Sequence, residues 1–228
     1  MRVLAIDTAL EACSAAVLDL ERGGIVASET IPMVRGHAEA LMPLIARVMD
    51  LAEAEFAGLD RISVTTGPGS FTGLRVGLSA ARGIALAANK PAVGVTTLTA
   101  YAAPIVSQNG EHPVVAAIDA RHDQVYLQVV SGDGTSLVRP RLAAIDEALT
   151  AWQFGSPHLV GNAAGLLASR WPSHAMAPFR VEAQAAPEIA WVGWLGAAVN
   201  PETAPPRPFY LRAPDARPAN RATQPASP

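Results

Sequence analysis

The chain has little of what several classes of protein require. Among its 228 residues there is a single cysteine, Cys13, which excludes a disulfide framework and favours a cytoplasmic protein. No stretch approaches the length of a membrane span, and the first seven residues turn acidic too soon for a signal peptide. The net charge of −3 does not indicate a broad nucleic-acid-binding face. We attribute the single lysine, Lys90, to genomic composition rather than to function.

The polar residues lack a recognisable catalytic or metal-binding pattern. The five histidines fall at no spacing typical of metal ligands. Ser70 and His37 could be drawn as a dyad, but Ser70 is better used as a helix cap. Cys13 lies on an alternating strand, which is typical of a small core residue. We therefore predict no catalytic residue, no metal ligand and no cofactor.

The first half of the chain reads as a three-stranded meander followed by alternating helices and strands. Half of all residues are hydrophobic, enough for one large domain or two small ones. Hydrophobic periodicity predicts strands at 2–7, 13–20, 24–31, 61–66 and 91–95, and helices at 37–52 and 72–88.

The second half repeats this plan. Residues 113–119 again form an apolar strand that ends in an aspartate. We expect further strands at 124–130, 135–139 and 158–161, and helices at 144–151, 162–170 and 187–199. Such an internal duplication predicts an α/β fold of two similar halves.

The glycine-rich stretch 66–77 joins a strand to a helix. Pro68 fixes its own backbone, the glycines permit a sharp turn, and Ser70 or Thr72 could cap the helix that follows. Helix N–H groups that follow such a turn can face a phosphate. A tight corner without a ligand is the alternative.

Small residues recur every four positions on the helix 72–88. Gly73, Gly77 and Ala81 form this ridge, which would let another element approach very closely. Burial between layers of this chain is one explanation, and a helix of a partner protein is the other. We favour the partner because the helix 37–52 is also more apolar than one sheet face requires.

Asp7-Thr8, followed by Ser14, resembles the first phosphate loop of the actin, Hsp70 and sugar-kinase superfamily, and Asp119 lies at the position of the second loop. Both loops lack glycines that would let the backbone close on a phosphate, since Ala9 and Ala120 stand in their places. We therefore regard the pair as a vestigial nucleotide site. The alternative is an active nucleotide-binding ATPase or small kinase of the same superfamily.

Taken together, the motifs resemble those of the bacterial TsaB (YeaZ) family. They are Ile6-Asp7-Thr8, Cys13 to Ala16, Arg35-Gly36-His37, Gly67 to Gly77, Asp119-Ala120-Arg121 and Tyr210-Leu211-Arg212. The resemblance covers residues 1 to about 212. It implies an actin-like (ASKHA, RNase H-like) duplicated α/β fold of two half-domains, each with a mixed sheet flanked by helices.

The resemblance also implies a function. The family is a catalytically silent relative of TsaD (the Gcp/Kae1 type), and acts with it to place a threonylcarbamoyl group on adenosine 37 of tRNAs that read codons beginning with A. TsaD holds its metal with two histidines after a strand, and Thr97 and Tyr101 stand at those positions here. Neither residue readily replaces an imidazole at a metal. The resemblance thus implies a scaffold that activates TsaD, joined by the ATPase TsaE, with tRNA reached indirectly and no membrane contact.

In this family the helices 37–52 and 72–88 resemble the pair that forms a four-helix bundle with TsaD, and the chain alone could self-pair through them. The implied interface residues are His37, Leu41, Leu44, Ile45, Val48, Thr72, Gly73, Arg75, Val76, Gly77, Ala80, Ala81 and Ile84. We expect an N-terminal half-domain at 1–103 and a C-terminal one at 104–212. The Pro, Ala and Arg residues of 213–228 predict a disordered tail.

Overall fold

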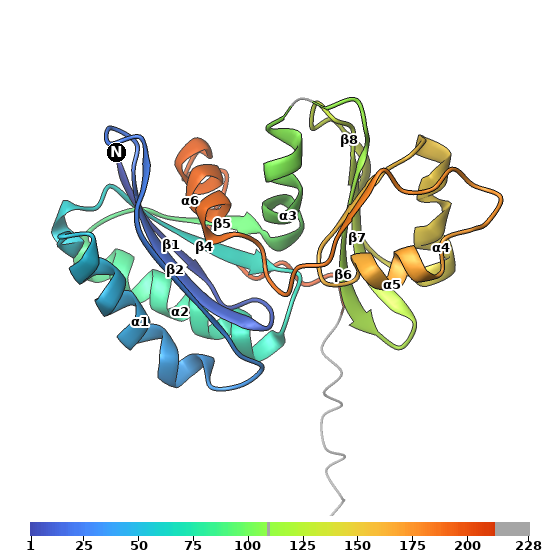
Figure 1. Cartoon of the computed structure of the whole chain (residues 1–228). Helices are drawn as coiled ribbons and strands as arrows, with labels where there is room; N and C mark the ends of the chain where they lie inside the picture. Colours follow the sequence, from blue (N-terminus) through green and yellow to red (C-terminus); the bar gives the residue numbers. More distant parts are fainter. Residues whose placement is uncertain (109, 213–228) are drawn as a thin grey trace, which may run out of the picture.

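Two five-stranded mixed sheets stand side by side in the computed structural model, which describes residues 1–108 and 110–212 (Figure 1). We call the parts built on them lobe 1 and lobe 2. The predicted tail, 213–228, lies outside the described residues.

The sheet of lobe 1 has the strand order β3-β2-β1-β4-β5. β1 pairs antiparallel with β2 and parallel with β4, so the strand that ends in Asp7 lies at the centre of the sheet. The residues of β1 and β2 are almost all buried, because helices cover both faces of the sheet. The strands are β1 (Arg2–Asp7), β2 (Ala12–Asp19), β3 (Gly24–Pro32), β4 (Arg61–Gly67) and β5 (Ala92–Thr96).

The sheet of lobe 2 repeats this order as β8-β7-β6-β9-β10. β6 is antiparallel to β7 and parallel to β9, as β1 is to β2 and β4. The predicted duplication and α/β fold are therefore confirmed. The strands are β6 (Val114–Arg121), β7 (Gln124–Val130), β8 (Ser136–Ala144), β9 (His158–Val160) and β10 (Arg180–Glu182).

Helices α1 and α2 lie on one face of the first sheet, and α6 packs on the other face (Figure 1). Helix α3 contacts β4 and β5 of lobe 1 and β6 and β7 of lobe 2, so it lies between the lobes. The helices are α1 (His37–Leu51), α2 (Phe71–Ala88), α3 (Thr97–Val106), α4 (Ile145–Leu149), α5 (Ala164–Ser169) and α6 (Ile189–Ala198), with 3-10 turns at η1 (Phe56–Gly58) and η2 (Thr150–Phe154). In the two described ranges, every helix is too short or too polar to cross a membrane.

Two features correct the sequence-based division of the chain. The predicted boundary between 103 and 104 falls inside α3. Helix α6, which is late in the sequence, packs against β1 and β4 of lobe 1 because its residues are apolar all round. Arg61 fixes its end by donating from Nη1 to the carbonyl oxygens of Gly196 and Val199, each at 2.7 Å. Lobe 1 is thus completed by a helix from the C-terminal part of the chain.

Candidate functional site

The glycine-rich turn is a corner packed against the loop after β1. Ser70 caps α2 as predicted, since its hydroxyl accepts from the N–H of Gly73 at 3.3 Å. The Ser70 N–H donates to the carbonyl of Ala9 at 2.7 Å. A Cβ on Gly69 would lie 2.3 Å from the same oxygen, so only glycine fits there. Of the two readings of this turn, the tight corner agrees with these contacts.

The small-residue ridge of α2 faces the chain's own sheet. A Cβ at Gly73 would lie 2.1 Å from the carbonyl oxygen of Thr8, and one at Gly77 would lie 2.5 Å from Oγ1 of Thr8. Ala81 is fully buried as well. The expectation that this ridge meets a partner helix is therefore corrected: the ridge lets α2 approach the end of β1.

The apolar stripe of α1 is likewise inside the core. Leu41, Leu44, Ile45 and Val48 are all at most 1% exposed. His37 is also largely buried, and its Nε2 lies 3.0 Å from the carbonyl oxygen of Leu10. Most of these predicted interface residues therefore pack inside lobe 1 rather than on its surface.

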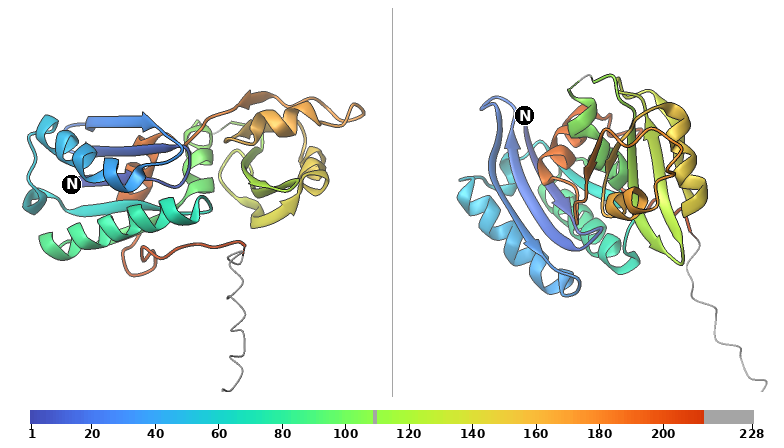
Figure 2. Two further views of the ribbon diagram at one scale, coloured as in Figure 1. Left: turned by 90° about the horizontal axis from the view of Figure 1, so that it is seen from below. Right: turned by 45° about the vertical axis from the view of Figure 1, so that its right-hand side comes forward.

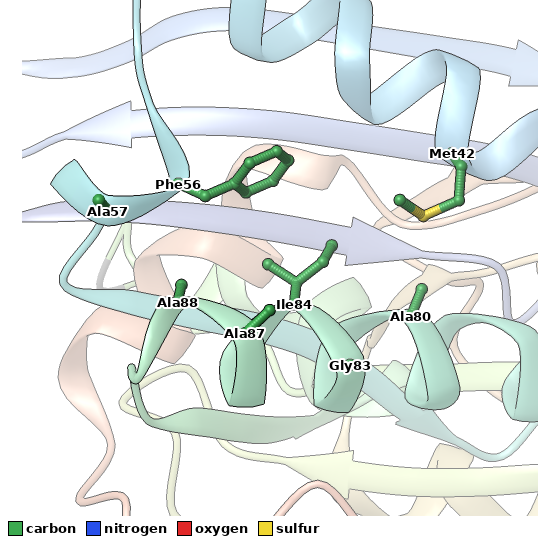
Figure 3. A pocket seen from close by; sticks show the side chains of 8 residues that line it. All are labelled: Met42, Phe56, Ala57, Ala80, Gly83, Ile84, Ala87 and Ala88. Atoms are coloured by element: carbon green, nitrogen blue, oxygen red, sulfur yellow. The ribbon is translucent and has the colours of Figure 1, made fainter.

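What remains exposed is a groove between α1 and α2. Two adjoining hollows share Met42 and Ala80, and the first has a volume of about 470 Å³. In Figure 3, Met42 from α1 and Phe56 from η1 point toward Ile84, with Ala80, Ala87 and Ala88 on the same side of α2. We call this surface the α1–α2 groove. Its lining is Ala38, Leu41, Met42, Phe56, Ala57, Phe71, Thr72, Arg75, Val76, Ser79, Ala80, Gly83, Ile84, Ala87 and Ala88.

Predicted interface residues divide between this groove and the core. Thr72, Arg75, Val76 and Ala80 line the groove, while Ile84 and Leu41 reach it from largely buried positions. Met42, Phe56, Gly83 and Ala87 were missed. The α2 members could have been found, because positions 72, 76, 80, 83 and 87 follow helical spacing along a stripe beside the ridge.

Asp7 is a buried structural group. Its Oδ1 accepts from the hydroxyl of Thr65 and from the N–H of Ala9, at 2.5 and 3.0 Å. Its Oδ2 has no hydrogen-bond partner among the described residues. Burial raises the pKa of the Asp7 carboxyl, and the two hydrogen bonds oppose this rise only in part.

Of the four predicted nucleotide-loop residues, Asp119 lines the polar cleft between the lobes. A polar cleft of about 420 Å³ lies between the lobes, and the described residues that line it include Asp119, Arg121 and Asn162 but not Asp7, Thr8 or Ser14. Asp119 is exposed and accepts from the N–H of Arg121 at 2.7 Å. Thr8 and Ser14 are both buried.

Thr97 and Tyr101 lie at the start of α3, between the lobes. Thr97 is fully buried, and the Tyr101 hydroxyl donates to the carbonyl of Gln184 at 2.9 Å. Burial raises the pKa of Tyr101 well above its ordinary value, so the phenol stays protonated. Within residues 1–108 and 110–212, no group of three or more histidine, cysteine or acidic side chains could hold a metal ion.

Comparisons with known proteins identify the family of this chain. The sequence model of "TsaD: tRNA N6-adenosine threonylcarbamoyltransferase" matches residues 14–163. The tRNA threonylcarbamoyladenosine biosynthesis protein TsaB of Escherichia coli is 40% identical over 126 residues, which are 55% of this chain and 53% of that protein. The chain thus spans about half the length of the first curated relatives that it matches.

Two further relatives match along nearly the whole chain. An uncharacterized protein of Mycobacterium tuberculosis is 33% identical over 218 residues, 95% of this chain and 94% of that protein. The solved structure of YeaZ from Pseudomonas aeruginosa superposes with a TM-score of 0.76 at 28% identity, covering 92% of this chain and 99% of that one. The chain therefore belongs to the TsaB (YeaZ) family, within the wider family of TsaD-like proteins.

Proposed function

We propose that this chain is a non-catalytic subunit in the threonylcarbamoylation of tRNA adenosine 37, and that its α1–α2 groove binds a TsaD-type protein. The observation that carries the proposal is an exposed apolar groove between two helices of lobe 1. Met42 and Phe71 both line this groove, and they are 49% and 39% exposed. Apolar side chains gathered in one groove mark an interaction surface.

The family match indicates which kind of protein would fit the groove. A TsaD-type protein shares the family model that matches residues 14–163, so it is expected to carry a helix pair equivalent to α1 and α2. Two such pairs can pack about a pseudo-twofold axis into a four-helix bundle. The small residues Ala80, Gly83 and Ala87 would admit a helix close to α2. The same symmetry allows two copies of this chain to pair when the partner is absent.

The non-catalytic role rests on the positions where chemistry would be expected. Tyr101 is bound to a backbone carbonyl and Asp7 to Thr65 and Ala9, so neither faces a substrate. In this proposal the TsaD-type partner performs the transfer, and a TsaE-type ATPase joins the assembly.

Reconstitution tests the proposal. Unmodified tRNA, threonylcarbamoyl-adenylate, a TsaD-type protein and a TsaE-type ATPase are incubated with and without this chain, and modified adenosine is measured by mass spectrometry. We expect modification only when the chain is present, and none with the chain as the sole protein. Equal modification without the chain would refute the proposal.

A further inference from the structure

We infer that the outer edge of α2 and the C-terminal segment 200–212 together form a contact surface for RNA. This inference rests on the proposed function, which supplies tRNA as the substrate of the assembly. We call the segment 200–212 the strap, and the four arginines Arg75, Arg82, Arg207 and Arg212 the basic strip.

The strap runs alongside α2 from lobe 1 to lobe 2 (Figure 2, left). The carbonyl of Ala204 accepts from the N–H of Gly94 at 2.9 Å, and the N–H of Phe209 donates to Thr66 at 2.8 Å. At its end, Nη1 of Arg212 donates to the carbonyl of Ala120 in lobe 2 at 2.8 Å. The strap therefore brings its arginines beside those of α2.

Apart from Glu202 near the start of the strap, the charged residues along this surface are basic. The sequence contains no acidic residue between Asp60 and Glu111, a range that includes all of α2, and none between Glu202 and Arg212. The whole chain nevertheless carries a net charge of −3. Positive charge is therefore concentrated on this surface although the chain as a whole is negative, as expected of a surface that binds an anion.

Among the described residues, no carboxylate forms an ion pair with an arginine of the strip. Arg82 donates from Nε to the carbonyl oxygen of Pro206 at 3.0 Å, and Arg212 is held by a backbone carbonyl in the same way. In the part of the chain that the structure describes, no strip arginine lies within 4.0 Å of a carboxylate, whereas Arg2 and Arg47 each form an ion pair. A carbonyl orients a guanidinium without neutralising it, which leaves the charge available to phosphate.

Exposed aromatic rings lie within the strip. The rings of Phe71 and Tyr210 are 5.4 Å apart, and the Arg75 guanidinium lies 3.7 Å from the centre of the Phe71 ring. Phe71, which also lines the α1–α2 groove, is 39% exposed, and Tyr210, outside the groove lining, is 41% exposed. Aromatic rings and arginine planes stack on unpaired bases, and arginines contact the adjoining phosphates. This combination favours RNA over an acidic protein surface, which needs no exposed rings.

The test measures binding of an unmodified tRNA that reads codons beginning with A, by fluorescence anisotropy over a series of salt concentrations. It uses the complex with the TsaD-type protein and, in parallel, the chain alone. The strip variant is Arg82→Gln with Arg207→Gln, and Arg82→Lys with Arg207→Lys retains the charge. Arg139→Gln with Arg141→Gln removes the same charge from β8 of lobe 2, where Arg141 also loses its ion pair with Glu147. Arg75 is left unchanged because it also lines the α1–α2 groove.

We expect the strip variant to bind tRNA about tenfold more weakly at 0.1 M salt, with the slope of log K against log salt reduced by about 1.4 to 1.8. The lysine pair and the β8 pair should bind like the unaltered chain. Unchanged affinity and slope in the strip variant would overturn the inference, as would an equal loss in the β8 variant. A loss of affinity for the TsaD-type protein instead of tRNA would identify the strip as a protein contact and also overturn it. If the complex fails to form at all, the proposed function fails, and the titration of the chain alone still decides the strip.

Discussion

Substitution of a glycine by alanine in α2 should have opposite effects on stability, depending on which of Gly73, Gly77 and Gly83 is changed. Alanine at Gly73 or Gly77 places a methyl group against Thr8, at 2.1 Å from its carbonyl oxygen or 2.5 Å from its Oγ1. Alanine at Gly83 meets no heavy atom within 4 Å. The difference arises because Gly73 and Gly77 face β1, whereas Gly83 lies in the exposed α1–α2 groove.

The magnitudes follow from two terms. Glycine to alanine inside a helix stabilises by about 0.8–1 kcal/mol, and at Gly83 nothing opposes this gain. At Gly73 the overlap must be relieved by moving α2 away from β1, an overpacking cost of about 1–3 kcal/mol. The hydrogen bond from the Thr8 hydroxyl to the Gly73 carbonyl, 2.7 Å long, would also be strained, at about 1 kcal/mol. The sum predicts a net loss of about 1–3 kcal/mol for Gly73→Ala.

Thermal unfolding followed by circular dichroism measures these changes. For a chain of this size, 1 kcal/mol corresponds to a shift in Tm of about 2–4 °C. We expect Tm to rise by about 2–4 °C in Gly83→Ala and to fall by about 2–12 °C in Gly73→Ala. A rise in Tm for Gly73→Ala equal to that of Gly83→Ala would refute the assignment of the ridge to internal packing.

Three further predictions concern buried polar groups. Tyr101→Phe should destabilise the fold by about 1 kcal/mol in urea denaturation, because the Gln184 carbonyl loses its donor, and an unchanged midpoint would contradict this. Calorimetry with ATP and magnesium should detect no binding that depends on Asp7, since its carboxyl is buried and bound internally; heat that disappears in Asp7→Ala would support the alternative of an active nucleotide-binding enzyme. The hydrogen bond from Arg2 lowers the pKa of Asp19 below its ordinary value of 3.8, so its contribution to stability is present above about pH 4 and is lost as the pH falls through the lower folded value. Acid unfolding of Arg2→Gln should therefore depend less on pH in that range, and an identical pH profile would speak against the pair.

Much of the fold could be predicted because its signals are local. The strand that ends in Asp7, its counterpart at Val114–Arg121 and the cap at Ser70 all follow from short patterns of burial or hydrogen bonding. The return of α6 to lobe 1 could not, because it depends on Arg61 meeting carbonyls more than a hundred residues away. Helix α3 was missed because the threonines and Pro104 of its sequence are poor helix formers.

The groove lies between the two helices that the sequence singled out, but several of the predicted interface residues face the core. Gly73, Gly77 and Ala81 correctly indicated a close approach, yet a periodicity does not say which element approaches. That element is Thr8 of the same chain, the residue directly after β1. The groove itself depends on the packing angle of α1 against α2 and on Phe56 from a separate turn, and neither is encoded in one stretch of sequence.

The most direct test of the account is the mass of the assembly formed with a TsaD-type protein, measured by light scattering coupled to size exclusion. Gly83→Arg places a positive charge in the middle of the α1–α2 groove. Binding of the TsaD-type protein would bury this charge without a counter-charge, which costs several kcal/mol, so association should weaken by at least about a hundredfold. Gly165→Arg makes the same change on an exposed glycine of α5 in lobe 2, where an added Cβ has no contact closer than 3.9 Å. We predict that the unaltered chain and Gly165→Arg elute with the partner as a heterodimer, whereas Gly83→Arg elutes apart from it. A heterodimer formed equally well by Gly83→Arg would contradict the assignment of this groove to the partner.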